Sequence, residues 1–214
     1  MIFHVMNRGV RKMSLFEDPE DYATLTGCVV EALAKTSVDV FAFCIMPNHF
    51  HFVLRPFRDS DLSHFMQLMT MRHSKRWHRR RGSTGGGAVY QGRFRAFPIE
   101  TDRYFFTACR YVEANPLRAR LVEKAEDWRW SSLFQRVKNC STLPLAEWPI
   151  VQPVDWADRV NAVQKDRDLQ QLRRSMKSSV PLGSKDWTMR TARLLGKEPS
   201  LNRPGPRKKK SGVN

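Results

Sequence analysis

Apolar and polar residues repeat with two different periods over the first 115 residues, which separates strands from helices. Helical spacing, with apolar residues three or four positions apart, covers Asp18–Lys35 and Asp61–Arg80. A third helix is expected from a cap at Thr101 to about Asn115, where Pro116 ends it. Runs rich in β-prone residues predict four strands, at Ile2–Arg8, Val38–Met46, Phe50–Pro56 and Tyr90–Ile99.

The order of these elements is strand, helix, strand, strand, helix, strand, helix. A split β-α-β arrangement fits it, so the sequence predicts an α+β fold with an antiparallel sheet, helices packed on one face and a ferredoxin-like core. Pro47 and Asn48 form a turn signal between the second and third strands, and Gly82–Gly87 is a loop of small residues.

The pattern loosens after Trp130 and predicts an extension to this core. We expect a catalytic domain over residues 1–137 and a connection with helices over 138–202. Two helices are expected in that connection, at Arg159–Met176 and Lys185–Leu195. Residues 203–214 form a basic, proline-interrupted tail that is expected to be disordered without nucleic acid.

The net charge narrows the class of partner. The chain has 37 Lys and Arg against 21 Asp and Glu, a formal charge of +16, which predicts attraction to a polyanion. A membrane surface is the weaker candidate, because the chain has neither a long apolar run nor a basic amphipathic helix with a wide apolar face. The start does not look like a secretory signal, and no cysteine pair has C-x-x-C spacing, so a cytoplasmic protein with reduced thiols is expected.

Two histidines in Met46-Pro47-Asn48-His49-Phe50-His51-Phe52 share one side of a predicted strand. Residues two apart on a strand point the same way, so His49 and His51 project together while the phenylalanines face the core. Two such imidazoles can bind one divalent ion. The pair alone also fits ordinary strand histidines with hydrogen-bond partners.

A second motif, Arg110-Tyr111-Val112-Glu113-Ala114-Asn115-Pro116, places Tyr111 and Asn115 four residues apart on a predicted helix. A tyrosine hydroxyl can attack a phosphodiester and form a covalent ester, and an amide oxygen can bind a metal. Alone, the motif better fits a packed tyrosine and an asparagine that caps the helix end.

The ordered series of motifs resembles the single-tyrosine HUH transposases, and among them the branch associated with bacterial palindromic repeats. The histidine motif resembles the HUH motif, and the Tyr111 segment resembles the catalytic-tyrosine segment. Three further segments fit that branch, at residues 3–9, 89–94 and 127–132. The resemblance spans roughly residues 2–135.

The resemblance implies a role for each of these residues. His49 and His51 match the metal-binding histidines, Tyr111 matches the nucleophile, and Asn115 stands where related enzymes place a polar third ligand. It further implies Mg²⁺ or Mn²⁺ as cofactor, single-stranded or hairpin DNA as partner, a 5′-phosphotyrosine intermediate, and a monomer or homodimer in the bacterial cytoplasm near the nucleoid. Imidazole ligands favour Mn²⁺ over the harder Mg²⁺.

Basic residues crowd the end of the second predicted helix. Because like charges at this density repel one another unless an anion is present, phosphate binding is expected here, with Trp77 as a stacking surface for bases. Arg93, Arg95 and Arg118 are second candidates, close to the catalytic motifs. The helix residues expected to contact DNA are Arg72, Lys75, Arg76, Trp77, Arg79 and Arg80.

Two other functions fit the same fold. One is a DNA-binding regulator that does not cut, and the intact His49, His51 and Tyr111 argue against it. The other is a metal-dependent nuclease that uses water, with Tyr111 structural. Water attack leaves no covalent protein–DNA adduct, so adduct formation distinguishes the two enzymes.

Overall fold

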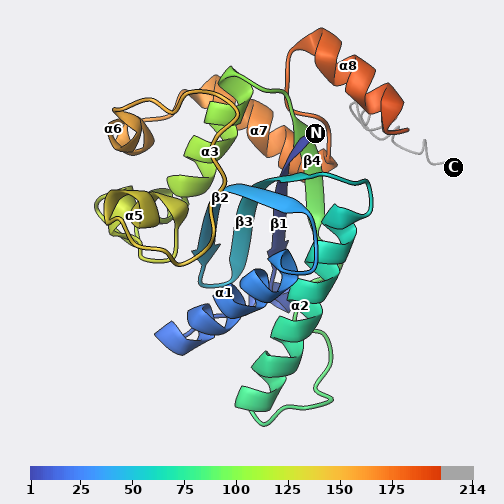
Figure 1. Cartoon of the computed structure of the whole chain (residues 1–214), viewed down its shortest axis with the longest axis vertical. Helices are drawn as coiled ribbons and strands as arrows, with labels where there is room; N and C mark the ends of the chain where they lie inside the picture. The colour runs from blue at the N-terminus through green and yellow to red at the C-terminus, as the bar shows by residue number, and fades with distance from the viewer. Residues whose placement is uncertain (199–214) are drawn as a thin grey trace, which may run out of the picture.

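A four-stranded antiparallel sheet is the centre of the molecule. The structure is a computed structural model, and it describes residues 1–198. The strands are β1 (Ile2–Arg8), β2 (Val38–Met46), β3 (His49–Pro56) and β4 (Arg95–Ile99), in the spatial order β2-β3-β1-β4 (Figure 1). Every neighbouring pair is antiparallel, which confirms the predicted α+β class with an antiparallel sheet.

Helices cover both faces of the sheet rather than the one face that was predicted. On one face, α1 (Pro19–Leu33) and α2 (Asp61–Arg80) form an apolar core with residues such as Val5, Phe43 and Phe52. On the other, α3 (Arg103–Glu113) packs against residues such as Ala42, Val53 and Phe97. Apolar side chains of each strand point alternately to the two faces of the sheet, so the strands contribute to both cores. Each core therefore needs its own layer of helices.

Strand register sets which side chains share the α3 face. Phe50 and Phe52 of β3 are fully buried in the core under α1 and α2. His49 and His51 alternate with them and therefore face α3. Across the sheet, His49 pairs with Arg8 and His51 pairs with Met6. Residues directly opposite in an antiparallel pair point to the same face, so this register adds β1 side chains to the histidine row.

Later segments cover both edges of the sheet. At the β2 edge, the Ile45 amide donates to the Trp130 carbonyl at 2.9 Å, and the Phe43 amide donates to the Ser132 hydroxyl at 2.9 Å. At the β4 edge, Leu182 donates to the Pro98 carbonyl at 2.9 Å. Covered edges remove the unpaired backbone groups that would otherwise pair with a second chain.

Two predicted boundaries around β4 are wrong. The strand expected over Tyr90–Ile99 begins only at Arg95, and Tyr90 makes a single bridge to Gly9. Gly92, at φ 154°, stands between them in a backbone conformation that favours glycine and interrupts the ladder. Thr101 does not cap α3, because the residue before the helix is Asp102, at φ 69°.

The helix expected to run to Asn115 ends earlier. It stops at Glu113, and a short helix α4 (Asn115–Arg118) follows after Ala114. Pro116 lies in the first turn of α4. Amide hydrogens in the first turn have no acceptor within their own helix, so α4 loses no hydrogen bond to the proline. Proline thus starts a second helix here, while the first has already ended.

Short helices make up the rest of the described chain. They are η1 (Val10–Lys12), η2 (Ala125–Asp127), α5 (Ser132–Val137), α6 (Trp156–Asn161), α7 (Asp166–Ser178) and α8 (Lys185–Leu194). The single helix predicted over Arg159–Met176 is therefore two helices. The break follows Asn161, where Ala162 is extended, and the Asn161 side chain accepts from the Ala125 amide and donates to Glu126.

The C-terminal helices differ in what they cover. Helices α6 and α7 lie beside α3, whereas α8 lies beyond the β4 edge (Figure 1). The division at residues 137 and 202 stays a prediction, and the basic tail over 203–214 lies outside the described residues. In the described part of the chain, no helix is long and apolar enough to cross a membrane.

Candidate active site

The two histidines of β3 lie side by side under α3. The rings of His49 and His51 are 4.9 Å apart between centroids and nearly perpendicular, at 87°. Strand alternation brings them together, as the sequence predicted. The pair therefore brings two imidazoles close together on one face, as a shared divalent ion would require.

Each of these rings uses Nδ1 for its hydrogen bond. His49 Nδ1 is 2.6 Å from the Asn48 amide oxygen, and Asn48 is oriented by donating from Nδ2 to the Lys12 carbonyl at 3.2 Å. His51 Nδ1 is 3.0 Å from Nε2 of His4 on β1. Within residues 1–198 neither Nε2 atom of the pair makes a hydrogen bond, so both stay available as ligands.

Burial keeps these histidines neutral. It lowers the pKa of His49 to about 4, with a further contribution from the charge of Arg8. Burial also lowers the pKa of His51 well below its usual value, and the neighbouring His4 and His49 add to the effect. A neutral imidazole has a free lone pair for a metal at physiological pH.

Tyr111 of α3 lies against the same histidines. Its ring centroid is 6.0 Å from that of His51 and 6.5 Å from that of His4, in edge-to-face arrangements. The side chain is 8% exposed, and its hydroxyl makes no hydrogen bond with any residue that the structure describes. The sequence placed Tyr111 near His49 and His51 only by resemblance, and the fold brings it against His51, whose ring in turn lies beside that of His49.

The other three tyrosines lie in different surroundings. The Tyr90 hydroxyl is 2.7 Å from His73 Nδ1, and the Tyr104 hydroxyl accepts from Arg103 at 2.7 Å. Tyr22 stacks on Trp130 at 4.7 Å in the core under α1 and α2. Tyr111 is therefore the one tyrosine of the chain whose ring contacts the histidine pair.

Arg118 lies over the face of the Tyr111 ring. Its guanidinium carbon lies 3.9 Å from the ring centroid, and its NH2 donates to the Tyr111 carbonyl at 2.6 Å. Its NH1 is buried without a hydrogen-bond partner. A buried cation with one unused donor can bind an anion that reaches the tyrosine.

Asn115 begins α4 rather than ending α3, and its side chain caps neither helix. Its Nδ2 is buried without a partner, and its side chain makes no hydrogen bond within the described residues. The break at Ala114 means that Tyr111 and Asn115 are not on one continuous helix as predicted. The amide is nevertheless unused by the fold, as expected of a group that waits for a ligand.

The donor set at this site fits a divalent metal only in part. Two neutral imidazoles with free Nε2 atoms and one unengaged amide suit Mn²⁺ better than Mg²⁺. Among the described residues no group of three or more His, Cys, Asp or Glu side chains is arranged to bind a metal. Any ion held here would therefore depend on the histidine pair, on Asn115 and on ligands from a substrate.

The basic cluster on α2 meets acidic residues of α1. Arg72 and Arg76 bond to Glu31. Arg80 pairs with Asp18 at 2.6 Å and with Asp21 at 3.1 Å. Carboxylates inside the molecule thus balance the charge of Arg72, Arg76 and Arg80, so the repulsion argument for an external anion does not hold for these three. Phosphate binding by the cluster stays a prediction.

The remaining candidates on α2 are Trp77, Lys75 and Arg79. Trp77 donates from its indole nitrogen to the Leu15 carbonyl at 3.1 Å and lies under the Arg81 guanidinium at 4.3 Å, so one ring face is already covered. Lys75 and Arg79 make no ion pair within residues 1–198. They are the members of the cluster that remain available to DNA phosphates.

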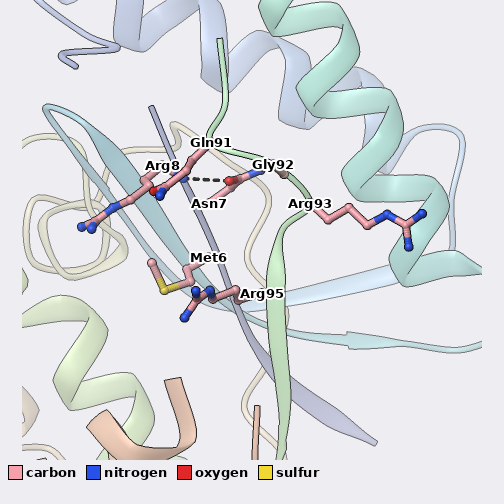
Figure 2. A pocket seen from close by; sticks show the side chains of 7 residues that line it. All are labelled: Met6, Asn7, Arg8, Gln91, Gly92, Arg93 and Arg95. Carbon is pink, nitrogen blue, oxygen red and sulfur yellow. Dashed lines mark hydrogen bonds between the residues drawn. The ribbon is translucent and has the colours of Figure 1, made fainter. Parts of the chain in front are cut away.

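A pocket opens beside the histidine row, at the end of β1. It is lined by Met6, Asn7, Arg8, Gln91, Gly92, Arg93 and Arg95 (Figure 2). Met6 pairs with both His51 and Arg95, so the Arg95 side chain starts two strands from His51 on the same face. In Figure 2 the guanidinium of Arg95 lies beside Met6, whereas Arg93 extends away from both.

His4, Arg8 and Asn48 are site residues that the sequence analysis did not identify. His4 and Arg8 fall at every second position of β1 with Met6, and that period alone places them on one face. Which strand this face meets depends on register, which the pattern along the chain does not contain. Asn48 belongs to the histidine motif itself, where it was interpreted only as a turn residue.

One solved structure of another protein supports this fold. A REP-associated tyrosine transposase bound to a REP hairpin matches with a TM-score of 0.51 and 17% identity, over 72% of this chain and 91% of that one. A protein from Deinococcus radiodurans R1, described as a candidate transposase, matches at 0.40 and 12% identity, over 65% and 89% of the two chains. No curated protein matches significantly.

A match to a family profile assigns the chain to a family, which structural similarity at 17% sequence identity does not. The profile described as Transposase IS200 like matches residues 1–115, which is more than half of the chain. The matched segment contains β1, both site histidines and Tyr111. The chain therefore belongs to the IS200-like transposase family, whose members process DNA.

Proposed function

We propose that this chain is a metal-dependent, single-strand DNA endonuclease and strand transferase with Tyr111 as nucleophile. The observation that carries the proposal is the position of the Tyr111 ring, 6.0 Å from His51 and beside the His49–His51 pair. A hydroxyl with no partner in the described chain, next to two neutral imidazoles, suits attack on a phosphate brought there by DNA.

His49 and His51, through Nε2, would hold Mg²⁺ or Mn²⁺ together with the Asn115 amide oxygen. When bound, the ion supplies positive charge that polarises the scissile phosphate and favours the phenolate. The two imidazoles and the amide carry no negative charge, so they leave the charge of the ion available to the substrate. The Asn115 side chain makes no hydrogen bond within the described residues, so its oxygen is not engaged elsewhere in the fold, and its buried Nδ2 would be free to donate to a substrate oxygen.

Tyr111 would attack the phosphorus through its hydroxyl oxygen. A bond forms between that oxygen and phosphorus while the bond from phosphorus to the 3′ oxygen breaks. The phenolic proton leaves to solvent, and the departing 3′ oxygen takes up a proton as a free hydroxyl. The 5′ phosphate stays on Tyr111 as an ester, which a 3′ hydroxyl can attack to rejoin strands without an external energy source.

Arg118 is placed to bind the same phosphate. Its guanidinium covers the Tyr111 ring, and its buried NH1 lacks a partner within the described residues. A phosphate oxygen that accepts from NH1 would satisfy that donor and place phosphorus near the tyrosine. This replaces the general DNA-binding role that the sequence suggested for Arg118 with one at the reacting group.

The DNA strand would cross the sheet face beside the histidines. Arg8 pairs with His49 across the sheet, and Arg95 lies one strand further along the same face. These cations extend from the histidine pair toward the pocket of Figure 2. The solved relative was bound to a REP hairpin, so we propose hairpin DNA of this kind as the substrate.

Incubation with 5′-labelled and 3′-labelled hairpin DNA and Mn²⁺, followed by a denaturing gel, tests this function. The expected product is a protein–DNA adduct that carries the 3′-side label and resists boiling. Cleavage without an adduct would instead indicate a nuclease that uses water. Binding without either product would indicate a regulator that has kept the fold.

Substitution of either histidine tests the metal assignment. His49→Ala and His51→Ala should abolish cleavage in Mn²⁺ while most DNA affinity remains, because affinity comes mainly from phosphate contacts elsewhere. His73→Asn, in the other core, is a matched control that should still cleave. Cleavage by His49→Ala at the wild-type rate would remove His49 from the metal site.

A further inference from the structure

A third histidine, His4 of β1, is buried behind the candidate metal pair. Its side chain is 0% exposed, and its ring stacks on Phe97 at 4.8 Å between centroids. Its Nε2 is 3.0 Å from His51 Nδ1, whereas its own Nδ1 is buried with no hydrogen-bond partner. The function proposed above gives His4 no task.

The surroundings of His4 would suit an apolar residue better. Phe97 and Tyr111 lie within 7 Å between ring centroids, and Val53 is its partner across the sheet. A buried polar atom without a partner costs about 1–3 kcal/mol, so a phenylalanine here would avoid that cost. A residue that is kept at the expense of stability points to a functional role.

Either His51 or His4 can be the donor of the hydrogen bond between them, and this choice decides whether His51 Nε2 is free to bind a metal. If His51 donates from Nδ1, its Nε2 has a free lone pair and can bind a metal. If His4 donates instead, the His51 proton is on Nε2 and that ligand is blocked. His49 shows the productive case, because the Asn48 oxygen can only accept, which fixes the His49 proton on Nδ1.

We propose that His4 is a positioning residue that accepts the His51 Nδ1 proton and so aims His51 Nε2 at the metal. Together with Asn48, it gives the two ligand histidines the same tautomer and fixes both rings. Outer partners of this kind typically change metal affinity 10–100-fold when they are removed. The inference rests on the proposed function, since it assigns His51 as a ligand.

Nuclear magnetic resonance of the full-length, metal-free protein with ¹⁵N-labelled histidine tests the tautomer directly. In the wild type, His51 should carry its proton on Nδ1. His4→Phe removes the acceptor, so His51 should lose that fixed tautomer. His4→Gln places an amide oxygen near the position of Nε2 and should restore it. A wild-type His51 protonated on Nε2 would overturn the proposal.

Calorimetric titration with Mn²⁺ gives a second readout that needs no DNA. His4→Phe should weaken binding about 10–100-fold and His4→Gln by no more than about threefold. Asn48→Ala should weaken it as His4→Phe does. A folded His4→Phe protein with wild-type Mn²⁺ affinity would overturn the inference, whereas a wild type that binds no Mn²⁺ would instead overturn the proposed function.

If His4→Phe does not fold, a comparison of His4→Gln with His4→Asn still tests the proposal. Gln places its oxygen near the position of Nε2, and Asn places its oxygen near that of Nδ1. Only His4→Gln should therefore retain Mn²⁺ affinity and the His51 tautomer. Equal affinity of the Gln and Asn variants would show that the 3.0 Å contact does not position His51.

Discussion

The ring of Tyr111 meets the ring of His51 edge to face, at 87° and 6.0 Å between centroids. The two residues are 60 positions apart in sequence and come from opposite layers, one from α3 and one from β3. The contact joins the proposed nucleophile to the proposed metal site inside a single chain, since both side chains belong to the same copy.

Tyr111→Phe should therefore eliminate the covalent protein–DNA adduct. The ring and its contacts with Arg118 and His51 remain, so the free energy of unfolding should change by less than about 1 kcal/mol. Loss of the nucleophile should reduce cleavage by a factor on the order of 10⁴ or more. Denaturing gels measure both the adduct and cleavage.

Tyr104→Phe is the matched control, because Tyr104 lies on the same helix with its hydroxyl bonded to Arg103. It should still form the adduct. Mass spectrometry of the wild-type adduct should find the nucleotide on the tryptic peptide that begins at Tyr111 and ends at Arg118. An adduct on any other peptide would move the active site.

Local patterns in the sequence were sufficient to place His49 and His51 on one face. The alternation His49-Phe50-His51-Phe52 needs only the period of a strand, and the structure confirms it with the phenylalanines buried. The four strands and the first two helices follow for the same reason. Helix α2, for example, has the predicted bounds Asp61–Arg80.

Features that depend on pairing between distant segments could not be predicted in this way. His4 reaches His51 only because β1 pairs with β3 in one register. Arg80 meets Asp21 only because α1 packs against α2, and the sequence analysis interpreted the same arginines as phosphate ligands. Neither relation leaves a periodic signal along the chain.

Asn115 should contribute to metal binding through its amide oxygen. Asn115→Ala should weaken Mn²⁺ about tenfold, whereas Asn115→Asp should match or exceed the wild type, because a carboxylate is a harder and charged ligand. Calorimetric titration of the metal-free protein measures both. If the Ala variant keeps wild-type affinity, the third ligand comes from elsewhere.

Arg95 should contact the DNA backbone. It lies on the histidine face, and within residues 1–198 its hydrogen bonds are long ones, of 3.4 and 3.5 Å, to the carbonyls of Met176 and Lys177. Arg95→Ala should lower the slope of log K against log salt by about 0.7 for single-stranded DNA. Binding titrations at four salt concentrations give this slope.

Arg93 provides the matched comparison, since its side chain extends away from Met6 and Arg95 in Figure 2. Arg93→Ala should change the salt slope less than Arg95→Ala does. Equal losses from the two variants would show that the DNA path is not restricted to the histidine face.

The arginines at the end of α2 should stabilise the fold. Arg81 forms two hydrogen bonds with Asp21, at 2.7 and 3.0 Å, and Asp21 is only 3% exposed. Arg81→Ala leaves that carboxylate with Arg80 and the Glu17 amide, so the free energy of unfolding should fall by about 1–3 kcal/mol. Urea denaturation monitored by circular dichroism measures it.

Lys75 and Arg79 allow the opposite test on the same helix, because they make no ion pair within the described residues. The Lys75→Ala, Arg79→Ala double variant should keep its stability and lose up to about 1.4 in the salt slope for single-stranded DNA. An unchanged slope would show that α2 does not face DNA.

His73 should make the protein less stable in mild acid. It is 1% exposed on α2, its Nδ1 is 2.7 Å from the Tyr90 hydroxyl, and burial lowers its pKa to about 4. The neighbouring Asp21 raises this pKa, whereas Arg81 and Arg76 lower it, so burial decides the direction.

The sign follows from proton binding in the two states. Between pH 4 and about 6.5 the unfolded chain protonates His73 while the folded chain does not, so the free energy of unfolding falls as the pH falls. The full difference corresponds to roughly 3 kcal/mol and is complete below the folded pKa. Above pH 7 both states are neutral and the term vanishes.

His73→Asn isolates this contribution, because the Asn side chain can still bond to the Tyr90 hydroxyl while it does not titrate. Urea denaturation of both proteins at pH 8, 6, 5 and 4.5 should show a variant whose stability falls less steeply, by up to about 1.4 kcal/mol per pH unit. Burial of His4, His49 and His51 contributes to the slope that remains. Parallel curves for wild type and variant from pH 8 to 4.5 would mean that His73 takes up its proton in the folded protein as readily as in the unfolded chain.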